Sequence, residues 1–331
     1  MPKIEDIYAK LAGGQQFTKL DLMQAYLQLS VHENSKELVT INTHKGLYRY
    51  IRMPFGIAST PAIWQRTIEE VLQGIPGIQV MLDDIVITGK DDQEHLQNLD
   101  KVLARLEEYG LRLNLDKCQF FKDSVTFCGH IIDRDGLHKT PDKIQAITNA
   151  QKPENITQLK PFLGLVNYYG KFLPDLPTVL NSLHRLLHKG QQWKWNQICE
   201  DAFRKVKELV TSEQVLTHYD PEEPIKLACD ASTYGIGAVI SHIIEGHEKP
   251  IAFASRTLNP AAKNFAQIDK EALGLIWGIK KFHTYLYGRI FILETDHQPL
   301  VHIFQHERKF LQQHRQEFTD MQHFSLDMIM I

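Results

Sequence analysis

The sequence predicts a multidomain α+β protein, and three observations support this fold class. The chain has 331 residues, more than one hydrophobic core usually holds, so two or three domains are expected. Short β-rich runs mix with amphipathic helical runs up to about residue 140, and a helical stretch follows. A final region of strands around one long helix begins near Pro224. We therefore expect domains at residues 1–140, 141–220 and 221–331.

Predicted elements of the first region are two strands, a hairpin and two helices. β-forming residues indicate strands at 16–22 and 27–31, and a hairpin of 80–82 and 85–87 around two aspartates. A helix over 59–73 begins at Thr60 and Pro61, and a second over 93–109 ends at Gly110.

The remaining elements follow from the same signals. Helices are expected at 141–150, 156–169, 176–187 and 198–211, with Pro153, Pro174 and Gly190 between them. Strands are expected at 225–230, 237–241, 250–255, 290–296 and 323–331, with one helix at 268–285. Strands followed by a helix and another strand predict a small α/β domain.

Composition is that of a folded protein with ordinary charge balance. Hydrophobic residues make up 43% and charged residues 23% of the chain. No run approaches the roughly 18 apolar residues of a membrane span, the first residues lack a signal peptide's apolar stretch, and the four cysteines are widely spaced. We expect an intracellular protein without a membrane partner. A net charge of -3 neither announces nor excludes nucleic-acid binding.

A first group of carboxylates lies in the first region. Asp83 and Asp84 stand between β-forming tripeptides, where burying them is costly unless a cation neutralises them. Oxygen-only ligands suit Mg²⁺. Alone, the pair reads more simply as a solvated turn, since Asp is common in turns. Asp21, on a second short strand, adds the carboxylate from a separate strand that two-metal nucleotidyl transfer needs.

A second group lies in the last region. Asp230 closes one apolar strand, Asp296 ends another, and Glu271 sits near the edge of an apolar helix face. Ligand sites in α/β sheets gather at such carboxyl ends. Each acid alone reads as a solvated strand or helix end. Together, the three predict a metal site, because an acid facing a sheet needs a partner.

Several motifs resemble successive blocks of the gypsy-type LTR retrotransposon reverse transcriptases in order and spacing. Those of the first region are FTKLDL at 17–22, AY at 25–26, MPFGI at 53–57, PAIWQ at 61–65, LDD at 82–84 and FCGH at 127–130. FLGLVNYYGKF at 162–172 resembles the thumb and connection. CDAS at 229–232, IDKEAL at 268–273 and TDHQPL at 295–300 resemble the ribonuclease H of the same elements.

The resemblance implies a fold and an activity. The fold is a right-hand polymerase palm of antiparallel sheet and helices with the fingers largely missing, a helical thumb and connection, and an α/β ribonuclease H-like domain lacking its last helix. The activity is RNA-directed DNA synthesis with cleavage of RNA in RNA–DNA hybrids. Partners would be an RNA template, a DNA primer, the hybrid and dNTPs. Each active site would take two Mg²⁺ ions, with Mn²⁺ as a substitute, in the cytoplasm, a virus-like particle or the nucleus.

Polymerase roles carry over by residue. Asp21 and Asp83 would hold the metals with Asp84 beside them, and Tyr26 would exclude a sugar 2′-hydroxyl. The other implied positions are Phe55 and Gly56 in the nucleotide pocket, Gly129 in the hairpin that grips the primer, and Met81, where the family usually has tyrosine.

In the ribonuclease H-like region, Asp230, Glu271 and Asp296 would bind the metals. Simpler readings stay open for the aromatic residues. Tyr26 and Phe55 alone would be core residues, and so would Tyr168.

The resemblance also suggests a chain trimmed at both ends. It would open after the basic fingers segment and close before the helix with the ribonuclease's fourth carboxylate, which Asp320 and Asp327 do not match. We therefore expect weak or absent polymerase activity.

Two other readings remain. One is a catalytically inactive, domesticated retrotransposon remnant that binds nucleic acid. The other is a zinc module of Cys118, Cys128 and His130, for which the sequence offers no fourth ligand at suitable spacing.

Overall fold

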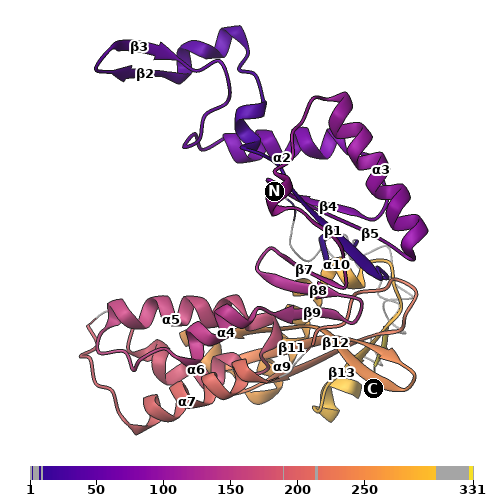
Figure 1. Ribbon diagram of the computed structural model, residues 1–331. Helices are drawn as coiled ribbons and strands as arrows, with labels where there is room; N and C mark the ends of the chain where they lie inside the picture. The colour runs from indigo at the N-terminus through magenta and orange to yellow at the C-terminus, as the bar shows by residue number, and fades with distance from the viewer. Residues whose placement is uncertain are drawn as a thin grey trace, which may run out of the picture. The chain divides into compact units, whose positions relative to one another are not determined.

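The computed structural model describes residues 2, 7–8, 10–188, 190–212, 215–302 and, for the backbone, 328–330. It divides into two compact units, residues 1–137 and 138–331 (Figure 1). The second unit contains both the 141–220 and the 221–331 regions, so their separation into two domains stays a prediction. The structure is of the mixed α+β class that the sequence predicts.

The first unit is built on a four-stranded antiparallel sheet in the order β4-β5-β1-β6. Its strands are β1 (Gln16–Asp21), β4 (Ile78–Met81), β5 (Asp84–Gly89) and β6 (Gln119–Lys122). Helices α2 (Thr60–Val71) and α3 (Asp92–Glu108) bury their apolar sides in the same core as β1 and β5. Pro61 starts α2, and the Asp91 side chain accepts a hydrogen bond from Glu94 N to cap α3.

Short elements complete this unit. They are the 3-10 helices η1 (Ala25–Gln28), η2 (Glu33–Val39) and η3 (Leu115–Lys117), and the strands β2 (Thr40–Thr43), β3 (Gly46–Arg49), β7 (Ser124–Phe127) and β8 (His130–Asp133). The next strand, β9 (Gly136–Lys139), begins in this unit and continues into the second. The predicted strand at 27–31 is wrong: Leu27 and Gln28 belong to η1, and of the rest only Ser30 pairs, in an isolated β-bridge with Arg52. The Gln28 side chain bonds the backbone of Met23 and Arg112, contacts that local β-propensity does not reveal.

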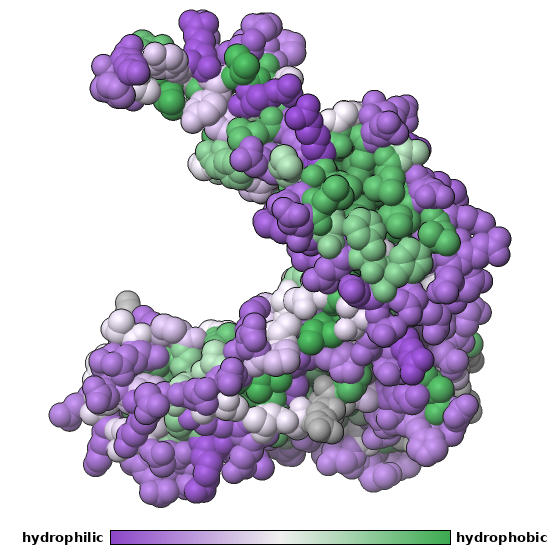
Figure 2. All heavy atoms as spheres, viewed as in Figure 1, coloured by the Kyte–Doolittle hydropathy of each residue, from purple (hydrophilic) through white to green (hydrophobic). Residues whose placement is uncertain are grey.

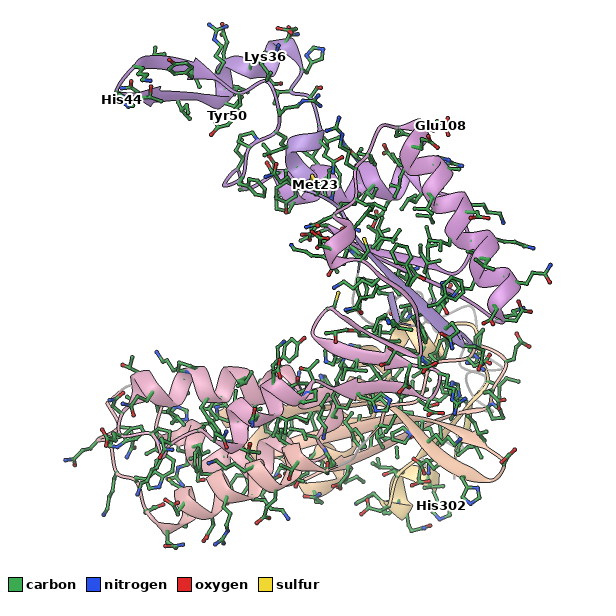
Figure 3. All side chains as sticks on the ribbon, viewed as in Figure 1. Met23, Lys36, His44, Tyr50, Glu108 and His302 are labelled. Carbon is green, nitrogen blue, oxygen red and sulfur yellow. The ribbon has the colours of Figure 1, made fainter. Side chains whose placement is uncertain are left out.

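The β2–β3 hairpin has little core of its own. Its tip is His44–Lys45, with Gly46 at φ 112° (Figure 3). Leu47 is 74% exposed, and Leu38, just before β2, is 85% exposed. Hydrophobic residues are accordingly visible among hydrophilic ones over this hairpin in Figure 2.

The second unit begins with helices. These are α4 (Pro141–Thr148), α5 (Ile156–Tyr168), the 3-10 helix η4 (Gly170–Phe172), α6 (Leu176–Arg185) and α7 (Gln197–Thr211). Asn155 and Asn196 cap α5 and α7 by accepting hydrogen bonds from Gln158 N and Cys199 N, both at 3.0 Å. These caps explain why the predicted helix starts agree closely with the structure.

A five-stranded sheet in the order β12-β11-β10-β13-β14 follows. Its strands are β10 (Ile225–Ala231), β11 (Gly235–Ile244), β12 (His247–Thr257), β13 (Phe291–Glu294) and β14 (Met328–Met330). β10, β11 and β12 pair antiparallel, whereas β13 runs parallel to β10 and to β14. Of the predicted strand 323–331, residues 323–327 and 331 lie outside the described residues, as do Asp320 and Asp327.

Helices α8 (Pro260–Lys263), α9 (Gln267–Lys281) and α10 (His283–Leu286) accompany this sheet. The predicted helix 268–285 is interrupted at Phe282, which separates α9 from α10. α9 shares the sheet's core through Leu275 and Ile279. Over the residues described, no helix is both long and apolar enough to span a bilayer.

The start of α6 docks on the turn between β10 and β11. Thr178 Oγ1 and Ser232 Oγ are 3.1 Å apart. A Cβ at Gly235 would lie 2.8 Å from the Pro177 ring and 3.0 Å from the Arg256 carbonyl, so only glycine permits this approach.

Candidate active sites of the two units

The carboxylates of the first unit meet at one end of its sheet. Asp21 ends β1 and is the direct antiparallel partner of Asp84, the first residue of β5. Asp83 lies in the two-residue turn between β4 and β5, and its carbonyl accepts a hydrogen bond of 2.8 Å from Leu22 N. Met81 ends β4 opposite Asp84. Strand register and the β4–β5 turn therefore place Asp21, Asp83 and Asp84 at the same end of the sheet.

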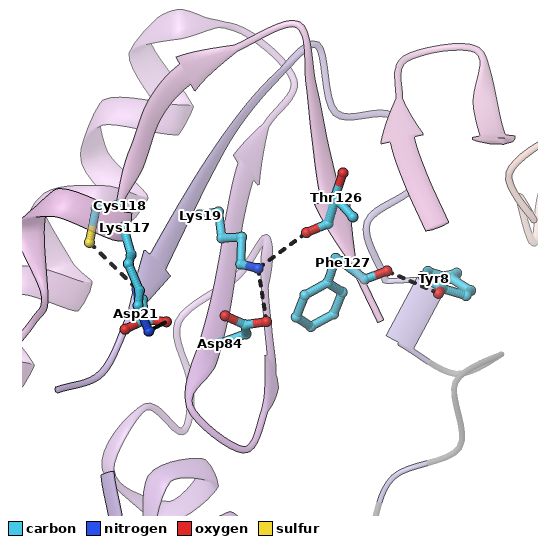
Figure 4. Close-up of polar contacts among 8 residues, drawn as sticks. All are labelled: Tyr8, Lys19, Asp21, Asp84, Lys117, Cys118, Thr126 and Phe127. Carbon is cyan, nitrogen blue, oxygen red and sulfur yellow. Dashed lines mark hydrogen bonds and ion pairs between the residues drawn. The ribbon is translucent and has the colours of Figure 1, made fainter. Parts of the chain in front are cut away.

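Two lysines balance these acids. Lys19 Nζ lies 2.9 Å from Asp84 Oδ2 and donates to the Thr126 carbonyl at 3.2 Å, and Lys117 Nζ lies 3.7 Å from Asp21 Oδ2 (Figure 4). Burial raises the pKa of Asp84, Lys19 opposes this, and the charges of Asp83 and Asp21 add to it. The net upward shift in the pKa of Asp84 therefore comes first from burial, and repulsion from the two neighbouring carboxylates adds to it.

An aromatic pair stands beside Asp83. The rings of Tyr26 and Phe55 are 5.1 Å apart, and Tyr26 also meets Trp64 edge-on at 6.4 Å. Burial and then the negative charge of Asp83 raise the pKa of the Tyr26 hydroxyl. Phe55 is 61% exposed, and Gly56 follows at φ 88° with open space around it. Because Phe55 is exposed, its contact with Tyr26 is more than core packing requires.

The FCGH motif forms a tight hairpin. Cys128 and Gly129 join β7 to β8 with φ angles of 46° and 75°. Both are left-handed, as the commonest two-residue hairpin turn demands. The buried His130 places Nδ1 2.9 Å from Tyr8 Oη. The sequence alone does not point to Tyr8, because an isolated tyrosine carries no local signal.

Two residues of α2 were quoted only as part of a motif, yet they contact the turn that carries Asp83. Trp64 Nε1 donates to the Leu82 carbonyl at 2.8 Å, and Gln65 Oε1 accepts from Leu82 N at 2.7 Å. One feature of the sequence could have pointed to Trp64 and Gln65: both side chains carry polar groups on the apolar face of a predicted helix.

The second site follows from the parallel pairing of β10 with β13. Ala228 is in register with Glu294. Asp230 and Asp296 each stand two residues beyond that pair, and since side chains alternate along a strand, both can point to one face. Each is exposed at the carboxyl end of its strand.

Glu271 approaches the same point from α9 and is 3% exposed. Gln267 Nε2 donates to Glu271 Oε1 at 2.6 Å and to the Ala231 carbonyl at 2.7 Å, which fixes the carboxylate against β10. Burial raises the pKa of Glu271; the charges of Asp230 and Asp296 add to this shift, whereas Gln267 and His297 oppose it.

These three carboxylates form a candidate cation site. Asp230, Glu271 and Asp296 each place an oxygen within 4.8 Å of the other two. Across the described part of the chain this is the one such group of three; Asp21, Asp83 and Asp84 converge less closely, and Cys118, Cys128 and His130 do not form one. The zinc hypothesis thus lacks support in the described residues. An all-oxygen donor set with one buried member fits a hard divalent ion.

A cavity of about 390 Å³ opens at this site. Its wall includes Asp230, Asp296, Phe253 and also Pro174 and Asp175 from the segment before α6. Asp175 has φ 47°, and its side chain makes no hydrogen bond to its own helix. No local signal in the sequence predicts this wall, because Asp175 is distant from β10 along the chain.

Comparison with known proteins matches both units. Residues 1–132 match the family "Reverse transcriptase (RNA-dependent DNA polymerase)", and residues 195–293 match "RNase H-like domain found in reverse transcriptase". The Pol polyprotein of transposon 297 from Drosophila melanogaster is 37% identical over 303 residues, covering 91% of this chain and 28% of that protein. The Pol polyprotein of transposon gypsy, also from Drosophila melanogaster, is 34% identical over 316 residues, covering 91% of this chain and 30% of that protein.

A further transposon polyprotein and a solved structure are also similar to this chain. The transposon Tf2-3 polyprotein of Schizosaccharomyces pombe is 33% identical over 306 residues, covering 91% of this chain and 23% of that protein. The chain thus spans less than a third of the length of each of these relatives. The foamy viral protease-reverse transcriptase in complex with RNA/DNA hybrid has the same fold, with a TM-score of 0.83 at 22% identity, covering 99% of this chain and 45% of that one.

Both families use divalent metals, in keeping with the two acidic groups. The matches over most of the chain, together with the sheet that aligns Asp21 with Asp84, identify its family. The chain belongs to the reverse transcriptase and ribonuclease H family of gypsy-related LTR transposon Pol polyproteins.

Proposed function

We propose that this chain extends a DNA primer on an RNA template and cleaves the RNA of RNA–DNA hybrids. The first unit would perform synthesis, and the 221–331 region of the second unit would perform cleavage. The helical 141–220 region would serve as thumb and connection. The observation that carries the proposal is the convergence of Asp230, Glu271 and Asp296 in one unit, with the Asp21, Asp83 and Asp84 group in the other.

In synthesis, the primer 3′-oxygen would attack the α-phosphate of a dNTP and release pyrophosphate. Asp21 and Asp83 would hold two Mg²⁺ ions, which would stabilise the charge that develops on the phosphate oxygens. Tyr26, whose ring meets that of Phe55 at a tilt, would close the space below the sugar against a 2′-hydroxyl. The β7–β8 turn at Gly129 would hold the primer end.

In cleavage, a water oxygen would attack the phosphorus of the RNA strand and the 3′-oxygen would leave. Asp230, Glu271 and Asp296 would hold the metal, and Gln267 keeps Glu271 facing the two aspartates. Structures of the foamy viral protein with RNA/DNA hybrid and with dsDNA support nucleic acid as the partner.

Two single substitutions test the proposal. Asp83→Asn should abolish primer extension and spare hybrid cleavage, and Asp230→Asn should do the reverse. Each loss should be at least about a hundredfold, the size seen when a group that stabilises transition-state charge is removed. Asp100→Asn, at an exposed position of α3, is the matched control and should change neither rate.

The alternative is an inactive remnant that binds nucleic acid. That reading is right if the wild-type chain binds a hybrid but neither Asp83→Asn nor Asp230→Asn alters any measurable activity.

Omitting Mg²⁺ should stop both reactions of the active enzyme. Supplying Mn²⁺ in its place should restore them.

A further inference from the structure

The turn that presents Asp83 contains a backbone conformation that side chains rarely adopt. Leu82 has φ 56°, a left-handed value that is costly for a residue with a Cβ. It lies between Met81 and Asp83, in the two-residue connection of β4 and β5. Such a conformation persists only when the surrounding structure holds it.

Helix α2 supplies that support. Trp64 donates to the Leu82 carbonyl at 2.8 Å, and Leu82 N donates to Gln65 Oε1 at 2.7 Å. Both polar backbone groups of Leu82 are thus bonded by side chains of adjacent helix residues. Gln65 Nε2 also donates to the Val80 carbonyl at 2.9 Å, so one amide spans the strand and the turn.

The two side chains are themselves fixed. Trp64 is 0% and Gln65 2% exposed. Gln65 Nε2 reaches Glu69 Oε1 at 2.7 Å, one turn along α2. Trp64 also meets the Tyr26 ring at 6.4 Å, so the same indole borders the aromatic pair and the carboxylate turn.

We propose that Trp64 and Gln65 are positioning residues that hold Leu82 left-handed and thereby aim the Asp83 carboxylate at its metal. Neither touches the reacting atoms. This inference rests on the proposed function of the first unit. It predicts that their loss lowers the rate of the chemical step while primer–template affinity stays nearly unchanged.

Three variants of the full chain separate the contacts. Trp64→Phe keeps a ring but removes the donor to Leu82; Gln65→Met keeps the length but removes all of its hydrogen bonds; Gln65→Glu keeps only the acceptor for Leu82 N. Arg66→Gln is the control, since its side chain is 73% exposed on the same helix.

Primer extension should show a split between kcat and KM. Trp64→Phe should lower kcat about fivefold, because it loses one hydrogen bond to the β4–β5 backbone. Gln65→Met should lower kcat at least about twentyfold, because it loses two hydrogen bonds to that backbone and a third to Glu69. KM for primer–template should stay within about twofold in each. Because both residues act on Leu82, the double variant should lose less than the product of the single losses. The kcat of Gln65→Glu should lie between that of Gln65→Met and that of the wild type.

Two further measurements do not depend on catalysis. Amide hydrogen exchange at 80–84 should rise in Gln65→Met and Trp64→Phe but not in Arg66→Gln, with 291–294 as internal reference. Mn²⁺ titration in a Glu271→Gln background, which silences the second site, should show at least about tenfold weaker binding for Gln65→Met.

The outcomes separate this inference from the proposed function. If wild type never extends a primer, yet the variants change exchange and Mn²⁺ affinity as expected, the positioning role stands and the polymerase proposal fails. If Gln65→Met keeps wild-type kcat, or leaves exchange at 80–84 and Mn²⁺ affinity unchanged, the positioning role is refuted.

Discussion

Individual side chains in this protein show how burial decides chemistry. Glu271 is acidic, nearly inaccessible to solvent and close to two other acids, so its pKa is raised by burial and by Asp230 and Asp296. The neighbouring Cys229 shows the same effect, because burial and then the charges of Glu271 and Asp230 raise the pKa of its thiol to about 12. Cys229 is therefore a packing residue and not a nucleophile.

His242 is a buried residue whose protonation should destabilise the second unit. Its Nδ1 donates to the Pro224 carbonyl at 3.0 Å, and its Nε2 accepts from Asp220 N at 2.9 Å. This pattern needs a neutral ring, because a proton on Nε2 would face the Asp220 N–H. Burial lowers its pKa; the Pro224 carbonyl, Asp220 and Glu223 oppose this shift, and Arg289 adds to it.

Because this pKa is lowered from 6.5, the stabilisation is complete above pH 6.5 and is lost as pH falls through the folded-state pKa. Urea unfolding between pH 5 and 8 should show stability falling with acidification. His242→Gln, which can keep one donor and one acceptor, should flatten that dependence. His247→Gln, at an exposed position, serves as control; equal slopes for wild type and His242→Gln would contradict the prediction.

Among the helices, the glycines of α9 determine how closely it approaches the sheet. A Cβ at Gly278 would stand 2.6 Å from Cys229 Sγ and 3.3 Å from Ala238 Cβ. The helix therefore lies closer to β10 and β11 than any larger residue would allow. That distance matters because Glu271 is on the same helix, facing Asp230.

Gly278→Ala should destabilise the second unit by about 1–3 kcal/mol, because overpacking outweighs the gain in helix propensity. It should also slow hybrid cleavage, since α9 must shift away from Asp230. Gly164→Ala is a matched control in α5, where an added Cβ meets nothing within 4 Å. That variant should gain up to about 1 kcal/mol. Thermal melting and cleavage assays of both variants test this prediction; equal stability changes would refute it.

For the whole molecule, the formal charge of -3 raises the question of how it would bind polyanions. Carboxylates gathered in metal sites contribute negative charge locally, so lysines and arginines elsewhere can still contact phosphates. Net charge alone is therefore a poor guide to partners for this class of enzyme.

Binding of a labelled RNA–DNA hybrid should weaken as salt rises, because phosphate contacts release counterions. With four such contacts, affinity should fall roughly 150-fold between about 50 and 200 mM salt. Fluorescence anisotropy at several salt concentrations measures the slope. A slope near zero would show that phosphate contacts do not drive binding, and a single-stranded DNA of equal length provides the comparison.

The sequence alone determined the class of fold, most helices and the acidic groups. Helices α2, α3, α5 and α7 lie within about two residues of their predicted bounds, because caps, prolines and apolar periodicity are local signals. The β4–β5 hairpin was predictable for the same reason. The β7–β8 hairpin was expected only from the resemblance of the FCGH motif. Strands β6 and β9 and the β2–β3 hairpin were not predicted; β6 pairs with the distant β1, and β2–β3 has little buried surface to give it a clear apolar pattern.

Only the tertiary structure decided which side chains meet. Asp21 faces Asp84 through strand register, Glu271 reaches Asp230 because α9 crosses β10, and Asp175 joins the cavity wall because α6 docks on a distant turn. Trp64 and Gln65 contact Leu82 because α2 packs beside the β4–β5 turn. Local propensity acts over a few residues of chain, whereas these contacts depend on how separate elements pack, and no nearby sequence encodes that.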